Sequence, residues 1–418
     1  MNCRHCEAPL KHDFLDLGHA PPSNAYLSAA DLNKPEIYYP LRIRVCTNCW
    51  LVQTEDYARA DSLFSPEYAY FSSASSSWLA HAKHYCETII QRLKLGPESL
   101  VVEVASNDGY LLKNFIAAGI PCLGIEPAVE TAKAAEKLGI RVVKEFFGKA
   151  LGERLAREEG HADLIIGNNV FAHVPEINDF TQGMKAALTG GGTITLEFPH
   201  LMRLIAGKQF DTVYHEHFSY LSLSTVIAVF SKAGLRVFDV EELPTHGGSL
   251  RIYGCHNEDP RKTRESVSQL LQEEARHGLR DLSTYLTFQA HADRIKNELA
   301  TFLIEQKSRQ KLVIAYGAAA KGNTLLNYAG IRKDLLPFVS DVAPSKQGKY
   351  MPGSHIPIVP PEKIRETRPD FVLILPWNIA HEVIGQLAYI RQWGGRFVCA
   401  VPKLSVENPG DLWQDASR

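Results

Sequence analysis

The chain has 418 residues, of which 45% are hydrophobic and 22% charged, values ordinary for a globular protein of two or three domains. Lysine and arginine number 45 and aspartate and glutamate 47, a formal net charge of -2 at pH 7. Because the charges are interspersed and form no basic stripe, nucleic acid is a poor candidate for a partner. The N-terminus lacks the apolar core of a signal peptide, and no run of about 18 apolar residues occurs. We therefore expect a cytoplasmic protein without a membrane partner.

Four of the eight cysteines form two CxxC pairs, Cys3 with Cys6 and Cys46 with Cys49. Each pair aims two thiolates at one point, so together they supply the four ligands of a tetrahedral zinc ion. A chance cluster of free thiols is the alternative, and the paired spacing disfavours it. Four protein ligands leave no open position, so we expect a structural zinc in a lobe spanning residues 1–70. The other four cysteines are expected to be small apolar residues: Cys86, Cys122, Cys255 and Cys399.

Residues 99–109 read SLVVEVASNDG, a β-branched apolar run that ends in small residues and Asp-Gly. A helical pattern follows, which predicts a strand, a tight turn and a helix start, where backbone approaches a ligand closely. The glycines of GxGxxG are missing. The next strand, CLGIEPA, ends at Glu126, an acid placed to accept hydrogen bonds from the ribose of either NAD or S-adenosylmethionine.

The turn itself distinguishes these two ligands. EVASNDG resembles the first motif of class I methyltransferases, ADLIIGNNVFAHVPE resembles the fourth, and the turn at Gly190-Gly191-Gly192 precedes TITLEFP, where the fifth strand is expected. A generic doubly wound domain with another ligand is the alternative. The resemblance implies a central domain over residues 71–258 that binds S-adenosylmethionine through Glu103, Ala105, Asn107, Asp108, Gly109, Glu126, Asn168 and Asn169.

Residues 214–217 read Tyr-His-Glu-His, three ionisable side chains in a row beside a tyrosine. If this segment is extended, Tyr214 and Glu216 share one side and His215 and His217 the other. An exposed polar loop and a second metal site are alternatives, although HEH lacks the i, i+4 spacing of a helical zinc motif. We favour an acid–base cluster, because histidine titrates near neutrality and accepts a proton when a neighbour orients it.

The motifs CxxC…CxxC, YAYFSSASSS, EVASNDGYLL, NNVFAHVPE, YHEHFSYLS and THGGSLRIY follow one another in this order. Over nearly the whole chain this order is similar to that of the sugar C-methyltransferases of deoxysugar biosynthesis, whose three-part chains bind zinc, S-adenosylmethionine and a nucleotide-linked 4-keto sugar. The resemblance implies His217 as the general base, in a pocket completed by Tyr214, Glu216, His173 and Tyr68. Carbon becomes nucleophilic only after a proton beside the carbonyl is removed, and the resulting enolate needs hydrogen-bond donors at its oxygen.

Residues 259–418 begin with charged helical patterns and continue with LVIAYGAAAKGNTLLNY, a second strand, small-residue loop and helix start. GxxxxGK[ST] is absent, so this is no Walker A loop. We expect a helical connector and a second Rossmann-like domain that holds a nucleotide-diphosphate sugar; a purely supporting domain is the alternative. The HGGSLR segment is expected to line the pocket, with an ordinary hairpin turn as its alternative. The expected substrate contacts are His246, Arg251, Lys321, Asn323, Asp341, Lys346, Trp377 and Asn378.

The sequence thus predicts an α/β protein with an N-terminal zinc-binding lobe, a central class I methyltransferase domain and a C-terminal Rossmann-like domain. The predicted activity is C-methylation next to the keto group of a nucleotide-diphosphate keto-deoxysugar. An O- or N-methyltransferase acting on a small metabolite or sugar is the first alternative, and a zinc-ribbon adaptor without enzymatic activity is the second.

Overall fold

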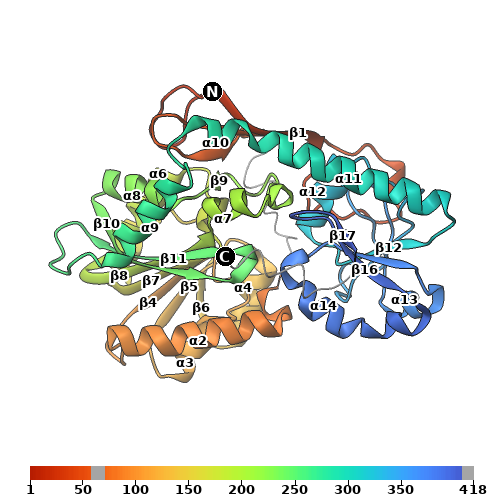
Figure 1. The fold of residues 1–418 in the computed structure, drawn as a ribbon. Coiled ribbons are helices and arrows are strands. Elements are labelled where there is room, and N and C mark those ends of the chain that lie inside the picture. The colour runs from red at the N-terminus through yellow and green to blue at the C-terminus, as the bar shows by residue number, and fades with distance from the viewer. Residues whose placement is uncertain (58–70, 407–418) are drawn as a thin grey trace.

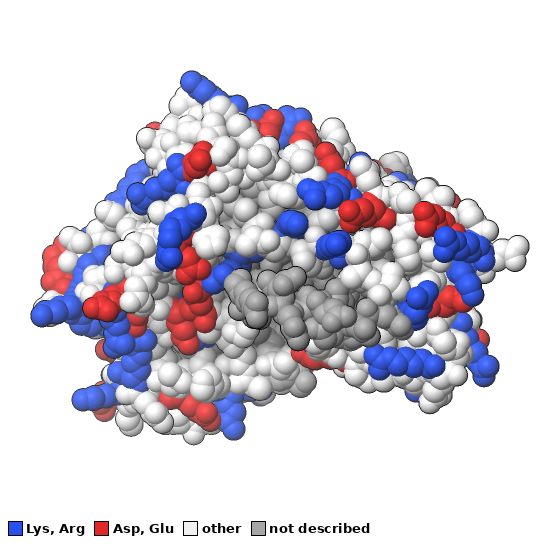
Figure 2. All heavy atoms as spheres, viewed as in Figure 1, with Lys and Arg blue, Asp and Glu red and all other residues white. Residues whose placement is uncertain are grey.

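The protein is described here by a computed structural model of residues 1–57 and 71–406, which contains three β-sheets with flanking helices (Figure 1). The predicted α/β class with N-terminal, central and C-terminal parts is confirmed. Among the described helices, none joins the length and the apolar character that crossing a bilayer requires. Lysine and arginine side chains alternate with aspartate and glutamate over the face drawn in Figure 2.

The N-terminal lobe is built on a four-stranded antiparallel sheet in the order β1-β2-β3-β9. Its own strands are β1 (His12–Ala20), β2 (Tyr39–Val45) and β3 (Val52–Thr54), with a short 3-10 turn η1 (Asp31–Asn33). The fourth strand, β9 (Ser219–Tyr220), comes from the central part and pairs with β3. Lobe and central part therefore share one sheet, and the domain boundaries at residues 70 and 258 stay predictions.

The central sheet has seven strands in the order β10-β11-β8-β7-β4-β5-β6. Strand β11 runs antiparallel to both neighbours, and the other pairings are parallel. The strands are β4 (Val101–Val104), β5 (Cys122–Ile125), β6 (Arg141–Val143), β7 (Ala162–Asn168), β8 (Leu188–Pro199), β10 (Leu235–Leu243) and β11 (Ser249–His256). This is the doubly wound sheet expected of a class I methyltransferase domain.

Helices cover both faces of this sheet, because successive residues of its strands point to opposite sides. In β4, Val101 enters one hydrophobic core while Val102 and Val104 enter the other. The helices and 3-10 turns of this part are η2 (Ser72–Ala74), α2 (Ser76–Leu93), α3 (Leu112–Ala117), α4 (Val129–Lys137), α5 (Lys149–Glu158), η3 (Phe171–His173), α6 (Ile177–Ala187), α7 (Leu201–Ala206), η4 (Phe210–Thr212), α8 (Leu223–Lys232) and η5 (Thr245–Gly247).

The three glycines at residues 190–192 differ from the expectation, because they lie inside β8 and not in a turn before it. Where β7 advances from Ala162 to Leu164, the paired strand β8 advances from Leu188 to Thr193. The glycines thus lie where the pairing of the two strands is irregular.

Three connector helices follow the central part along the chain; the first packs against the central part and the other two against β1 of the N-terminal lobe. They are α9 (Glu265–Arg276), α10 (Leu282–Leu286) and α11 (Phe288–Ser308), and α11 runs along the top of the molecule in Figure 1. Phe288 at the start of α11 stacks on Phe14 of β1, with ring centroids 4.6 Å apart. One hydrophobic core therefore runs from the lobe through the connector into the C-terminal part.

The C-terminal sheet has the order β14-β13-β12-β15-β16-β17, parallel except for the edge strand β17. Its elements are β12 (Val313–Tyr316), α12 (Ala320–Tyr328), β13 (Val339–Ser340), β14 (Ile358–Val359), α13 (Glu362–Thr367), β15 (Phe371–Ile374), η6 (Trp377–Ile379), α14 (Ala380–Gln386), η7 (Ala388–Trp393), β16 (Arg396–Cys399) and β17 (Ser405–Val406). This is the second Rossmann-like unit that the sequence predicted.

Candidate active site

The two CxxC segments of the N-terminal lobe fold into the same knuckle. In the first, the Glu7 N–H donates to the Cys3 carbonyl over 2.9 Å; in the second, the Trp50 N–H donates to the Cys46 carbonyl over 2.8 Å. Glu7 and Trp50 both have left-handed backbone, with φ of 65° and 61°. Identical local turns aim both pairs of sulfurs in the way that the spacing predicted.

The four sulfur atoms converge on one point and fit a zinc ion. The Sγ atoms of Cys3, Cys6, Cys46 and Cys49 all lie within 4.8 Å of one another, and Cys3 Sγ is 3.5 Å from Cys49 Sγ. Ligands 2.3 Å from a tetrahedral zinc stand about 3.8 Å apart. Gln53 Nε2 also donates to Cys3 Sγ over 3.2 Å, which suits a thiolate. The closed sulfur set gives this zinc a structural role.

The expected donor site lies at the carboxyl end of β4, where the chain turns into α3. Three residues of this loop have left-handed backbone: Ala105, Asn107 and Gly109, with φ of 57°, 50° and 78°. At Gly109 a Cβ would also come within 2.3 Å of Ile140 Cδ1, so that side chain would have to move. Glu126 braces the loop, since its carboxylate accepts the N–H groups of Asn107 and Ala128, each over 2.9 Å.

Buried acids surround this loop and favour a cationic ligand. Glu103 is 1% exposed, and neither of its carboxylate oxygens has a hydrogen-bond partner within residues 1–57 and 71–406. Burial, together with the nearby Glu126 and Asp108, raises the pKa of Glu103 well above its usual range. A buried carboxyl without a partner is costly, and the ammonium and sulfonium groups of S-adenosylmethionine would supply the missing positive charge. The residues present therefore fit the donor.

The Tyr-His-Glu-His segment is a turn and not an extended strand. The expectation for an extended segment, with Tyr214 and His217 on opposite sides, therefore does not apply. The His217 N–H donates to the Tyr214 carbonyl over 3.0 Å, so the chain reverses between them. The rings of Tyr214 and His217 consequently lie on the same side, with centroids 3.9 Å apart. His173, at the end of η3, adds a third ring 4.7 Å from that of His217.

The hydrogen bonds of His217 define which nitrogen is free to take a proton. Its Nδ1 lies 2.9 Å from the Thr212 carbonyl, an acceptor, so Nδ1 carries the hydrogen and Nε2 has the free electron pair. Burial, assisted by His173, lowers the pKa of His217 well below its usual value. His173 is oriented in the same way, with Nδ1 2.7 Å from the Glu216 carbonyl, and burial lowers its pKa to about 4. Both imidazoles are neutral at pH 7, the form that a general base requires.

Glu216 links the turn to the N-terminal lobe. Its side chain is 2% exposed and accepts a hydrogen bond of 3.1 Å from Asn24 Nδ2. Burial raises the pKa of Glu216. His215 lies 3.4 Å from the Tyr39 carbonyl of the lobe through Nε2. Of the three predicted residues in this turn, His217 contacts Tyr214 and also His173, while Glu216, like the adjacent His215, contacts the lobe.

The C-terminal part brings a cation to the same region. Lys321 Nζ, at the start of α12, donates to Asn378 Oδ1 over 2.6 Å and lies 4.5 Å from the centre of the Trp377 ring. The indole N–H of Trp377 in turn donates over 2.7 Å to Oδ2 of Asp211, three residues before the Tyr-His-Glu-His turn. Lys321 is near enough that its charge contributes to the lowered pKa of His217 and His246, whose main cause is burial.

The HGG turn of η5 packs between the two Rossmann-like units. A Cβ on Gly247 would come within 2.5 Å of the Trp377 ring, so only glycine allows this approach. On the other side, His246 Nε2 accepts a hydrogen bond of 3.2 Å from Asn169 Nδ2 at the end of β7. The turn predicted as a pocket wall thus contacts one predicted donor residue and one predicted substrate residue.

Asp341 repeats in the second unit the bracing that Glu126 provides in the first. Its carboxylate accepts the N–H groups of Ala318 and Ala343, each over 2.7 Å. Lys346 Nζ donates to the Ala318 carbonyl over 2.7 Å, and the Tyr26 hydroxyl of the N-terminal lobe bonds to the same oxygen. Asp341 and Lys346 therefore hold this loop, and a substrate contact by either stays a prediction.

Two predicted substrate residues are committed to contacts inside the protein. Arg251 is 5% exposed and forms ion pairs with Glu197 at 2.6 Å and Glu241 at 3.2 Å. Asn323 is 1% exposed and donates to the Ser23 carbonyl over 2.6 Å. Both residues thus stabilise the fold, and a substrate contact by either stays a prediction. Tyr68, the remaining predicted pocket residue, lies outside the described residues.

Sequence reasoning missed several buried or half-buried polar residues beside this site. Asn24, Asp211, Glu197 and Thr245 were not singled out, although each bonds to an element that carries predicted site residues. The place of Asp211 three residues before Tyr214, in the same polar run, was the one available signal. Asn24 offered none, because it stands 192 residues from its partner Glu216.

Comparison with known proteins identifies the class to which this fold and site belong. Family models match three successive parts: a zinc binding domain at residues 3–64, a methyltransferase domain at residues 78–240 and a C-methyltransferase C-terminal domain at residues 244–402. The C-methyltransferase NovU of Streptomyces niveus is 34% identical over 401 residues, which cover 96% of this chain and 95% of that protein.

Similar solved structures cover a smaller part of the chain. An S-adenosylmethionine-dependent methyltransferase of Thermotoga maritima is 18% identical with a TM-score of 0.34, covering 45% of this chain and 96% of its own. The magnesium protoporphyrin IX methyltransferase of Synechocystis, with S-adenosylhomocysteine bound, is 14% identical with a TM-score of 0.33, covering 43% and 81%.

The protein is an S-adenosylmethionine-dependent C-methyltransferase with a structural zinc site. It belongs to the family of zinc-containing sugar C-methyltransferases that its motifs resemble.

Proposed function

We propose that the enzyme methylates the carbon next to the keto group of a nucleotide-diphosphate keto-deoxysugar, with His217 as the general base. The observation that carries this proposal is the catalytic turn, in which an oriented neutral imidazole lies between Tyr214 and His173. O- or N-methylation needs only modest deprotonation of its acceptor, whereas an acid–base cluster of this kind is suited to removing a proton from carbon.

The chain's own residues divide the chemistry between them. His217 Nε2 takes the proton from the carbon beside the carbonyl. The electron pair of the C–H bond becomes a carbon–carbon double bond, and the π pair of the carbonyl moves onto its oxygen, which gives the enolate. The Tyr214 hydroxyl, on the ring that stacks against His217, serves as a donor to that oxygen. Bound S-adenosylmethionine supplies an electrophilic methyl group. The enolate carbon forms the new bond to that methyl, the methyl–sulfur bond breaks, and the keto group is restored.

The nucleotide diphosphate has a matching cation on the facing domain. Lys321 stands beside Trp377 and within electrostatic reach of both His217 and His246. Removal from water lowers its pKa to about 8, a state that an incoming diphosphate would reverse by favouring the ammonium form. We assign Lys321 and Asn378 to the diphosphate, and the donor residues Glu103, Asn107, Asp108, Glu126, Asn168 and Asn169 to S-adenosylmethionine.

The deciding experiment incubates the full chain with S-adenosylmethionine and a panel of 4-keto sugar nucleotides. We expect one member of the panel to gain the mass of one methylene, and its proton spectrum to show a new methyl group on carbon. A parallel sample in deuterated water, with S-adenosylhomocysteine in place of the donor, should exchange the proton beside the keto group. Methylation on oxygen or nitrogen in the first sample would contradict the proposal. So would methyl transfer in the first sample combined with no proton exchange in the second.

A further inference from the structure

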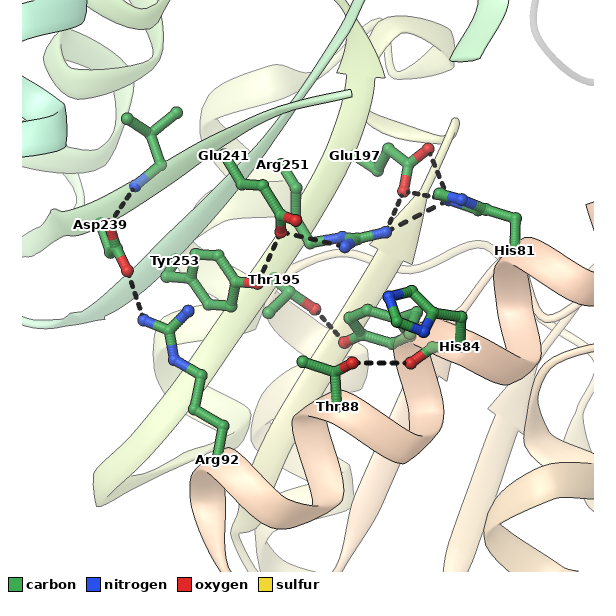
Figure 3. A network of polar contacts seen from close by, with 12 residues as sticks. His81, His84, Thr88, Arg92, Thr195, Glu197, Asp239, Glu241, Arg251 and Tyr253 are labelled. Carbon is green, nitrogen blue, oxygen red and sulfur yellow. Dashed lines mark hydrogen bonds and ion pairs between the residues drawn. The ribbon is translucent and has the colours of Figure 1, made fainter. Parts of the chain in front are cut away.

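A buried carboxylate, Glu197, lies at the carboxyl end of β8, beside the donor site but unused by the chemistry above. It is fully buried, and Figure 3 shows it between His81 of α2 and Arg251 of β11. His81 Nε2 lies 2.9 Å from Glu197 Oε2, and the Arg251 guanidinium donates to the same oxygen over 2.6 Å. These partners outweigh burial and lower the pKa of the carboxyl. Glu197 is therefore a fixed anion and is not available as a base.

The same residue also holds two loops in place. The Thr245 hydroxyl, in the HGG turn, donates to Glu197 Oε1 over 3.1 Å. The Asn169 N–H donates to the Glu197 carbonyl over 2.7 Å. The residues so held are strained, because Asn169 and His246 have φ of 53° and 54° without being glycine. Such backbone persists only where surrounding contacts enforce it, and Glu197 provides a contact to each loop.

The two strained residues face each other, since Asn169 Nδ2 donates to His246 Nε2 over 3.2 Å. The Trp78 ring lies 5.4 Å from the His246 ring and stacks on His81 at 4.9 Å, so α2 is part of the same arrangement. On its other side Trp78 lies 6.0 Å from Tyr110, which directly follows the donor loop. Three separate segments thus meet around one pair of side chains next to the donor loop.

We propose that Glu197 is a positioning residue of the donor site: it fixes the Asn169–His246 pair and Trp78 against the methionine end of bound S-adenosylmethionine. This inference rests on the placement of the donor beside Asn169 made above. The Glu197 carboxylate touches no reacting atom; it acts through Thr245 and His81, while the main-chain carbonyl at this position holds Asn169. Its loss should therefore weaken the capture of the donor before it affects proton removal by His217.

The sharpest test removes only the hydrogen bond from Thr245 to Glu197, with a pair of matched variants. Thr245→Val keeps the size of the side chain but loses the hydroxyl, whereas Thr245→Ser keeps the hydroxyl. Thr245 is half-buried in a turn, so neither change opens the core. Titration calorimetry with S-adenosylhomocysteine should show Kd raised about tenfold in Thr245→Val and within about twofold of wild type in Thr245→Ser. The donor KM should follow Kd, while kcat changes less.

A second variant controls for general loosening of α2. Arg92, near the other end of that helix, pairs with Asp239 of β10 (Figure 3). Arg92→Gln breaks this pair about three helical turns away from His81, and S-adenosylhomocysteine affinity should stay at the wild-type value. Unchanged affinity in Thr245→Val, no recovery in Thr245→Ser, or an equal loss in Arg92→Gln would each overturn the proposal.

The binding measurement contains no sugar, so it is independent of the substrate assignment. If wild type binds S-adenosylhomocysteine but methylates no keto sugar nucleotide, only the proposed substrate fails. If wild type does not bind S-adenosylhomocysteine, the placement of the donor and the role of Glu197 fail together.

Discussion

The indole N–H of Trp377 donates a hydrogen bond of 2.7 Å to the buried carboxylate of Asp211 and so joins the C-terminal unit to the segment that leads into the Tyr-His-Glu-His turn. Asp211 is fully buried and its other oxygen has no partner among the described residues. Burial raises the pKa of Asp211 to about 6, against the opposing effects of Lys321 and Trp377. The bond thus couples the predicted substrate-binding domain to the segment that carries His217.

Trp377→Phe should weaken both stability and catalysis, because it leaves Asp211 buried without its donor. Loss of a hydrogen bond to a buried charged group costs about 1.5–3 kcal/mol, which thermal unfolding should detect. We also expect KM for the sugar nucleotide to rise, since Lys321 packs on the lost indole. Trp393→Phe is the matched control, because its indole N–H bonds to the Pro369 carbonyl within one unit. Equal effects of both variants on KM would contradict the proposed coupling between the two segments.

His217→Asn should abolish turnover and leave donor binding nearly unchanged. The asparagine amide can still donate to the Thr212 carbonyl, as Nδ1 does, but it offers no basic nitrogen in place of Nε2. Loss of a general base typically lowers kcat by about 10²–10⁴-fold. Single-turnover methyl transfer and calorimetry with S-adenosylhomocysteine measure the two quantities separately. A rate within tenfold of wild type would move the base elsewhere, with His173 and His215 next to be tested; His215→Asn serves as the neighbouring control.

Stability should fall as pH drops from about 7 toward 5, because buried histidines resist protonation. Burial lowers the pKa of both His173 and His246 to about 4, against about 6.5 in the unfolded chain. The unfolded state binds more protons between these values, so the contribution of these residues is full above pH 6.5 and is lost as pH falls toward 4. Asp211, with its raised pKa, acts in the opposite direction below about pH 6.

Thermal unfolding of His173→Asn and His246→Asn at several pH values checks this assignment. Each variant should show a shallower fall of Tm with decreasing pH than wild type. His84→Asn, a change on the exposed surface of α2, should leave the slope unaltered. Parallel pH curves for wild type and both buried variants would show that other groups dominate.

Removal of one zinc ligand should affect catalysis at a distance. In Cys46→Ser we expect the metal content to fall from about one zinc per chain toward zero, with loss of the lobe's packing. Activity should fall as well, because Asn24 and Tyr26 of the lobe bond to Glu216 and to the Ala318 loop. Cys122→Ser, at a half-buried cysteine outside the cluster, should keep both metal and activity. Full activity in the metal-free variant would show that the lobe is dispensable.

The local features of the site followed directly from the sequence. Each CxxC knuckle closes through hydrogen bonds between residues four or five apart, so a short segment of the sequence determines its geometry. The same holds for the loop after β4 and for the acid that ends the second strand, which depend on strand, turn and helix propensities along one stretch of chain. For these reasons the zinc ligands, the α/β class and the two Rossmann-like units were predictable.

Only the tertiary structure decided which of these features meet. The Tyr-His-Glu-His segment suggested alternating faces, but the hydrogen bond from His217 to Tyr214 turns it and puts both rings on one side. Arg251 was predicted as a substrate contact, and only the structure shows that it also pairs with the buried Glu197, 54 residues away. The bond between Asp211 and Trp377 spans 166 residues. Such contacts depend on how whole sheets and domains pack, and no local pattern of residues records that packing.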